Sequence, residues 1–135
     1  MIKLINSIKQ NEGYRSRVYK DSLGIDTIGY GFAIKDLELE EDVCEIILER
    51  KLEKLIDRVN NKFKFLKDLP EDAQEVLYEM CYQMGVSGVS KFKKTLLYLE
   101  NREFRMASIE MLDSKWAKSD SPQRAKRLSD IIKGL

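Results

Sequence analysis

The chain has 135 residues, of which 43% are hydrophobic and 35% are charged, a composition typical of one folded domain and unlike that of a disordered chain. Its formal net charge is only +1, and no apolar stretch approaches the roughly 20 residues that span a bilayer, which excludes a membrane-spanning helix. It contains no histidine, which excludes a histidine-dependent triad and the usual zinc sites. Carboxylates are therefore the natural general acids and bases, and we expect no metal and no cofactor.

Charge is unevenly distributed along the chain. Residues 36–57 carry nine acidic and three basic side chains, whereas residues 91–135 carry eleven basic and six acidic ones. The acidic segment is typical of a solvated helix face. The basic segment has the charge to attract a polyanion, such as nucleic acid or a bacterial wall, and charge alone does not choose between them.

The amino-terminal residues predict an amphipathic helix over 2–12, with apolar residues at helical spacing and Gly13 as its end. This pattern differs from the continuous apolar core of a signal peptide, so we expect synthesis in the cytosol. Residues 14–19 and 25–30 then predict two short strands. The turn residues KDSLG between them predict a hairpin or a small meander.

Residues 39–65 predict a long helix, because apolar residues recur there at three- and four-residue steps. We expect Cys44 and Cys81 to be buried, reduced thiols in such apolar helix faces. Further helices are predicted from Pro70 to Met84, where Gly85 stops the helix, and over 89–100, 103–117 and 123–133. The fold class is therefore α+β and mostly helical, with a small amino-terminal lobe, a long connecting helix and a helical carboxyl-terminal lobe.

Three residues near the predicted hairpin have the chemistry of a hydrolase. Glu12 would end the first helix, where the partial negative charge of the last carbonyls disfavours ionisation. Asp21 would head the turn, and Thr27 would lie on the return strand. Taken singly, they are an ordinary surface glutamate, a turn-forming aspartate and a strand threonine. A hairpin packed against the helix end would bring together an acid, a base and a water-holding hydroxyl, as inverting glycoside hydrolysis needs.

Four segments occur in the order of the landmarks of a known family. They are NEGYRSRVYKD, TIGYGF, YQMGVSGVSKF and SKWAKSDSPQRAKRL. With these segments the chain resembles the T-even phage lysozymes, glycoside hydrolase family twenty-four, over nearly its whole length. The resemblance implies a single lysozyme-like domain, 1–135. Its small lobe would be 13–40 and its connecting helix 40–65, and its helical lobe would comprise 66–135 with the first helix, 1–12.

The resemblance also implies roles for individual residues. Glu12 would be the general acid, and Asp21 would direct a water with help from Thr27. The substrate-contacting positions implied are Ala33, Tyr82, Thr95 and Glu110. Supporting positions are Arg124, which would approach the catalytic glutamate, together with Gln83 and Phe32. The substrate would be the β-1,4 bond between N-acetylmuramic acid and N-acetylglucosamine in peptidoglycan, cleaved with inversion and without a metal.

The chain departs from the family pattern outside the catalytic trio. The segment between Phe32 and the long helix is shorter, Phe32 stands where a histidine is usual, Ala33 replaces a larger apolar residue and Glu110 replaces an amide. These changes bear on the length of glycan bound. On helical position alone, Tyr82 either lines a cleft or fills the core, whereas Trp116 is predicted to anchor the core.

Two other classes of function stay open at this point. The chain could be a cell-wall-binding module that has lost catalysis, or a nucleic-acid-binding helical protein that uses its basic carboxyl-terminal third. Our prediction is a monomeric endolysin that binds peptidoglycan and no nucleic acid and lyses the host cell. It would wait in the host cytoplasm until a membrane-permeabilising holin, implied only indirectly, released it to the wall in the periplasm.

Overall fold

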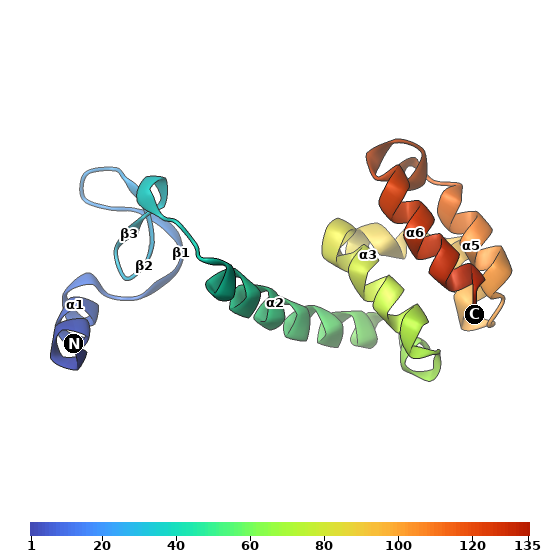
Figure 1. Cartoon of the computed structure of the whole chain (residues 1–135), viewed down its shortest axis with the longest axis horizontal. Coiled ribbons are helices and arrows are strands. Elements are labelled where there is room, and N and C mark those ends of the chain that lie inside the picture. Colours follow the sequence, from blue (N-terminus) through green and yellow to red (C-terminus); the bar gives the residue numbers. More distant parts are fainter. The chain divides into compact units, whose positions relative to one another are not determined.

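A computed structural model describes all 135 residues of the chain (Figure 1). The chain divides into two compact units, Met1–Glu45 and Ile46–Leu135, which we describe one at a time. Their boundary falls within the long helix α2 (Glu41–Lys62). The first unit contains one helix and a small antiparallel sheet, and the second is helical, so the predicted mostly helical α+β class is confirmed.

The first unit begins with α1 (Ile2–Glu12), which ends at Gly13 with a φ of 71°, as the sequence predicts. Three strands follow, β1 (Arg15–Lys20), β2 (Asp26–Gly29) and β3 (Phe32–Ala33), in the order β1-β2-β3. For this segment the sequence predicts a hairpin or a small meander, and the structure contains a three-stranded meander. Thr27 occupies its centre, because it pairs with Tyr19 on β1 and with Ala33 on β3.

Helix α2 has 22 residues and a length of about 33 Å at 1.5 Å per residue. Its buried residues, Leu55 and Val59, lie in its carboxyl-terminal half. Cys44 lies in the opposite half and is exposed, so the prediction that it is buried is wrong. The apolar periodicity continues along the whole helix, but only its second half contributes to the core.

The second unit continues with α3 (Glu71–Ser90), α4 (Lys93–Glu100), α5 (Phe104–Leu112), a π-helical turn (Trp116–Asp120) and α6 (Pro122–Lys133). Gly85 interrupts α3 with a φ of 78°, at the residue where the sequence predicts a stop. The predicted helix over 89–100 begins later, because residues 89 and 90 complete α3. The predicted helix over 103–117 ends at Leu112, and Trp116 begins the separate π-helical turn.

The hydrophobic core lies in the second unit, where α5 and α6 run side by side (Figure 1). Every buried hydrophobic residue of the protein belongs to this core, from Leu55 to Ile132. Trp116 is 3% exposed, which confirms it as a core residue, and burial raises the pKa of the Cys81 thiol to about 11. None of the helices combines the length and the apolar character needed to cross a bilayer.

Candidate active site

Asp21 and Thr27 are joined through the backbone of one residue between them, Ile25. The Ile25 amide donates to Asp21 Oδ1 at 2.9 Å, and the Ile25 carbonyl accepts from the Asp21 amide at 3.0 Å and from the Thr27 hydroxyl at 2.8 Å. The Leu23 amide also donates to Asp21 Oδ1, at 2.8 Å. Both functional groups therefore have fixed positions relative to one peptide.

These hydrogen bonds leave one oxygen of Asp21 and the lone pairs of the Thr27 oxygen available to accept further hydrogen bonds. Asp21 uses Oδ1 for the turn, and its Oδ2 has no hydrogen bond within the protein. Thr27 is 3% exposed and donates its hydroxyl hydrogen to the Ile25 carbonyl, so its oxygen retains lone pairs that can accept a hydrogen bond from water. Each side chain thus retains an oxygen that can accept a hydrogen bond, as a general base and a positioning hydroxyl must.

The β1–β2 turn that carries Asp21 is closed at its base. Lys20 and Asp26 pair across the two strands, and their side chains form an ion pair with 2.7 Å between Nζ and Oδ1. Both side chains are exposed, so this pair adds little stability. The turn is held mainly by the hydrogen bonds to Asp21, which is the ordinary role of a turn aspartate that the sequence also suggests.

Glu12 lies at the other end of β2, against the glycine that precedes β3. Gly31 has a φ of 76°, and a Cβ atom placed on it would lie 2.5 Å from Glu12 Oε2. Gly29, with a φ of 70°, is constrained in a similar way by the Phe32 ring, 2.7 Å from a Cβ placed there. Glycine at position 31 therefore permits both the left-handed backbone and the close approach of the Glu12 carboxyl group.

Aromatic contacts hold the end of α1 to the same β2–β3 turn. The rings of Tyr14 and Tyr30 lie with their centroids 5.7 Å apart, and Lys9 Nζ lies 5.3 Å from the Tyr30 centroid. Glu12 lies between Lys9 and Tyr14 in the chain. These contacts fix the helix end that carries the predicted acid.

The remaining predicted residues of the first unit lie on β3. Ala33 pairs with Thr27, and Phe32 pairs with Ile28 and is 47% exposed. The first unit thus contains the predicted acid, base and hydroxyl, together with one predicted substrate position and one predicted supporting position.

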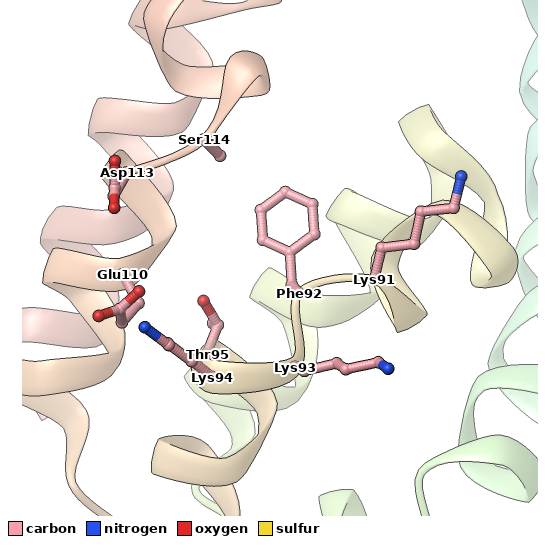
Figure 2. Close-up of a pocket in the computed structure, with 8 residues that line it drawn as sticks. All are labelled: Lys91, Phe92, Lys93, Lys94, Thr95, Glu110, Asp113 and Ser114. Carbon is pink, nitrogen blue, oxygen red and sulfur yellow. The ribbon is translucent and has the colours of Figure 1, made fainter.

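Two predicted substrate positions of the second unit line one hollow of about 440 Å³ between α4 and α5 (Figure 2). They are Thr95, which is 2% exposed, and Glu110. Tyr82 is 47% exposed, so its side chain lies at the surface and does not fill the core. It lines two other hollows, each of which is lined by residues of both α2 and α3, and does not line the hollow of Thr95.

The two predicted supporting residues on α3 and α6 make structural contacts. Arg124 Nε lies 3.1 Å from Glu79 Oε2, and Arg127 Nη2 lies 3.0 Å from the same oxygen. Gln83 accepts from Trp116 Nε1 at 2.9 Å and donates to Ser121 at 2.6 Å. These contacts tie α3 to the π-helical turn and to α6. The expected approach of Arg124 to Glu12 stays a prediction.

Sequence reasoning did not single out Ile25 or Gly31. Ile25 acts through its backbone, so its side chain carries no signal of the role. Gly31 gives a partial signal, because glycine in a short apolar strand segment suggests a turn or a close approach. The partner in that approach, Glu12, belongs to another element and is visible only in the fold.

Comparison of the sequence with known proteins identifies its family and several relatives. Residues 9–132 match the family described as phage lysozyme. The chain is 27% identical to a probable T4-type lysozyme 2 of Dictyostelium discoideum, with 96% of this chain and 92% of that protein covered. It is 32% identical to a SAR-endolysin of Bacteriophage PS119, over 55% of this chain and 46% of that protein.

Proposed function

We propose, from the premise that this chain belongs to the phage lysozyme family and is a glycoside hydrolase of peptidoglycan, that Glu12, Asp21 and Thr27 carry out its reaction. The family match covers all three residues, and the first unit holds them on consecutive elements. The observation that carries the proposal is the shared attachment of Asp21 and Thr27 to Ile25.

In the proposed reaction, Glu12 protonates the glycosidic oxygen as the leaving group departs. Asp21, through Oδ2, takes a proton from a water that Thr27 positions, and this water attacks the anomeric carbon from the opposite face of the sugar. The product then has the inverted configuration. Inversion requires room for the water, and carboxyl groups about 6.5–9.5 Å apart provide it.

The bond cleaved is, in this proposal, the β-1,4 linkage between N-acetylmuramic acid and N-acetylglucosamine. Ala33 beside Thr27 and the exposed Tyr82 ring are proposed to contact the glycan, and so are Thr95 and Glu110 in their shared hollow. Aromatic and hydroxyl side chains at partly open hollows suit sugar rings, which present both apolar faces and hydroxyl groups.

The test compares Glu12→Gln with Glu100→Gln, using release of reducing ends from purified peptidoglycan. Both glutamates are exposed final residues of a helix, of α1 and of α4, so the substitutions are matched in position and chemistry. We expect Glu12→Gln to lower turnover by about 10²–10⁴-fold while the fold is kept, because this is the factor that general acid catalysis typically contributes. Glu100→Gln should retain turnover.

Two outcomes would contradict the proposal. Substantial turnover by Glu12→Gln would remove the acid assignment. Binding of the unaltered protein to peptidoglycan without release of reducing ends would favour a wall-binding module that has lost catalysis.

We further propose that this hydrolysis serves lysis of a bacterial host. The partial match to a phage endolysin supports this role, whereas the amoebal relatives show that matches also occur outside phages. The same two variants extend the test to bacteria that express them. Lysis after the inner membrane is permeabilised should require Glu12 and should not require Glu100.

A further inference from the structure

Contacts within the fold neutralise only part of the basic segment, residues 91–135. Of its eleven basic side chains, five form ion pairs, one donates to a backbone carbonyl and three line the hollow between α4 and α5. The remaining two, Arg105 and Lys133, form no ion pair. Both line a separate hollow of about 230 Å³, which we call the α5–α6 hollow.

The α5–α6 hollow lies between two helices that run side by side in opposite directions (Figure 1). Each helix contributes four residues at helical spacing, so the hollow follows one face of each helix. The residues are Arg105, Ser108, Ile109 and Leu112 from α5, and Lys126, Ser129, Asp130 and Lys133 from α6. None of them is among the residues proposed for catalysis or for contact with the cleaved glycan.

Positive charge exceeds negative charge in the α5–α6 hollow by two. Its one acidic residue, Asp130, accepts from Lys126, whose Nζ lies 3.0 Å from Oδ2 and 3.3 Å from Oδ1. Arg105 and Lys133 have no such partner. Arg105 also lies in the first turn of α5, where the helix dipole disfavours a cation. An anion in the hollow would therefore be attracted by both free side chains and by this helix end.

The walls of the hollow add apolar surface and hydrogen-bond acceptors. Ile109 is 52% exposed and Leu112 is 41% exposed, so both present carbon atoms to solvent. Ser108 and Ser129 are buried, and each donates its hydroxyl hydrogen to the backbone carbonyl three residues before it, at 2.7 and 2.9 Å. Each serine oxygen can then only accept a further hydrogen bond. A ligand that suits these walls has an apolar face and hydroxyl donors beside its anionic group.

We propose that the α5–α6 hollow binds a sugar that carries a phosphate monoester, with the phosphate at Arg105 and Lys133 and the sugar ring along Ile109. A phosphate monoester has a charge of about −1.5 to −2 at pH 7, which matches the excess positive charge better than a singly charged carboxylate does. The Arg105 guanidinium group can donate two parallel hydrogen bonds to phosphate oxygens. Sugar rings have both the apolar faces and the hydroxyl donors that the walls suit.

This binding goes beyond the proposed hydrolysis, because it needs no contact with the bond that is cleaved. It would attach the protein to phosphorylated glycans of a bacterial envelope. Free phosphate has the same anionic chemistry, so the test has to compare the two sources. We assign the sugar ester because free phosphate would leave the apolar wall and the serine oxygens unused.

The first test is an NMR titration of the full-length protein with N-acetylglucosamine 6-phosphate. The controls are N-acetylglucosamine, which has no charge, glucuronate, which has one carboxylate, and inorganic phosphate, which has no sugar. We expect saturable shifts at residues 105–112 and 126–133, with an affinity for the sugar phosphate about tenfold or more above that for each control, the factor of one charged hydrogen bond.

Three variants locate the binding. Arg105→Met and Lys133→Met should each weaken it about tenfold, because each removes a hydrogen bond to a charged group. Lys93→Met is the matched control, since Lys93 is an exposed lysine of the same basic segment that forms no ion pair and does not line the α5–α6 hollow. It removes the same unit of charge and should leave the affinity unchanged.

Each contrary outcome overturns a stated part of the proposal. Equal affinity for inorganic phosphate would overturn the assignment to a sugar, and equal affinity for glucuronate would overturn the assignment to a phosphate. The absence of saturable shifts, or equal weakening by Lys93→Met, would overturn the site itself.

The second test measures KM and kcat by reducing-end release on cell walls that retain phosphorylated sugars and on the same walls after phosphatase treatment. Arg105→Met should raise KM on the first substrate only and leave kcat unchanged on both. An equal rise on both substrates, or none on either, would overturn attachment through phosphate. This second test rests on the proposed hydrolysis, whereas the titration needs no turnover, so failure of the site and failure of the proposed function are distinguishable.

Discussion

At the scale of single residues, the two carboxylate oxygens of Asp21 separate its structural role from its proposed catalytic role. Oδ1 accepts from the amides of Leu23 and Ile25 and shapes the β1–β2 turn. Oδ2 makes no hydrogen bond within the protein and is the atom that we assign to water. The ordinary structural interpretation of a turn aspartate and the catalytic one are therefore both compatible with the same side chain.

Two substitutions separate these roles. Asp21→Asn keeps an oxygen that accepts both amide hydrogen bonds but removes the base, so turnover should fall by about 10²–10⁴-fold. The free energy of unfolding should then change by less than about 0.5 kcal/mol. Asp21→Ala also removes both hydrogen bonds and should lower the free energy of unfolding by about 2 kcal/mol.

Urea unfolding and reducing-end release measure both quantities for each variant. If Asp21→Asn kept full turnover, Asp21 would have only the structural role. If Asp21→Ala were as stable as the unaltered protein, the hydrogen bonds to Leu23 and Ile25 would not shape the turn.

At the scale of elements, the end of α1 and the β2–β3 turn form one local structure. The Tyr14–Tyr30 contact, the position of Lys9 over Tyr30 and the approach of Glu12 to Gly31 all join these two elements. Sheet formation positions Thr27, and the turn that ends the same strand positions Glu12. The meander therefore positions Glu12, the proposed acid, relative to the Thr27 hydroxyl through contacts between elements that are near each other in the sequence.

Gly31→Ala should disturb this structure. The new Cβ would meet the Glu12 carboxyl group at 2.5 Å, and a misplacement of about 1 Å can cost about 10²-fold in rate. The positive φ adds a strain of about 1–2 kcal/mol. The matched control is Gly85→Ala, which has a φ of 78° but no atom within 4 Å of its added Cβ.

Both variants carry the strain of a positive φ, but only Gly31→Ala should lose turnover, measured as release of reducing ends, because only its added Cβ meets Glu12. Equal turnover in the two variants would show that the approach of Glu12 to Gly31 has no part in catalysis.

At the scale of the whole molecule, the buried core and the proposed catalytic residues lie in different parts of the chain. Among residues 1–45, Thr27 is the single buried residue, whereas the buried apolar cluster begins at Leu55. Burial of apolar area is the main favourable term in folding, so global unfolding should depend on the second unit. Cys81, which is 1% exposed, is the titratable side chain of that cluster.

Alkaline pH should therefore destabilise the protein through Cys81. Its pKa rises from 9.0 to about 11 on burial, so between these values the unfolded chain loses a proton that the folded protein keeps. The free energy of unfolding contributed by this group is intact below pH 9 and falls as the pH rises toward 11, by up to about 3 kcal/mol.

Urea unfolding from pH 8 to 11 checks this effect. Cys81→Ala should show a shallower decline than the unaltered protein, and the matched control Cys44→Ala, at an exposed thiol, should show the same decline. Identical slopes for all three proteins would mean that Cys81 ionisation does not limit stability.

The sequence by itself determined the local features of this protein. Helical periodicity, Gly13 and Gly85, and the turn residues after Tyr19 identify most elements, because propensities and caps act over a few neighbouring residues. The order of Glu12, Asp21 and Thr27, together with the family landmarks, was enough to identify a lysozyme.

The tertiary structure decided which residues of each sequence pattern are buried or make contacts. Cys44 and Leu55 share one apolar stripe, yet only Leu55 is buried, because burial depends on the elements that pack against a helix and not on its own periodicity. Likewise, the attachment of Asp21 and Thr27 to Ile25 and the need for glycine at position 31 arise from contacts between backbone and side-chain atoms of different turns and strands. Such contacts leave no pattern in a single sequence, since their geometry exists only after the chain has folded.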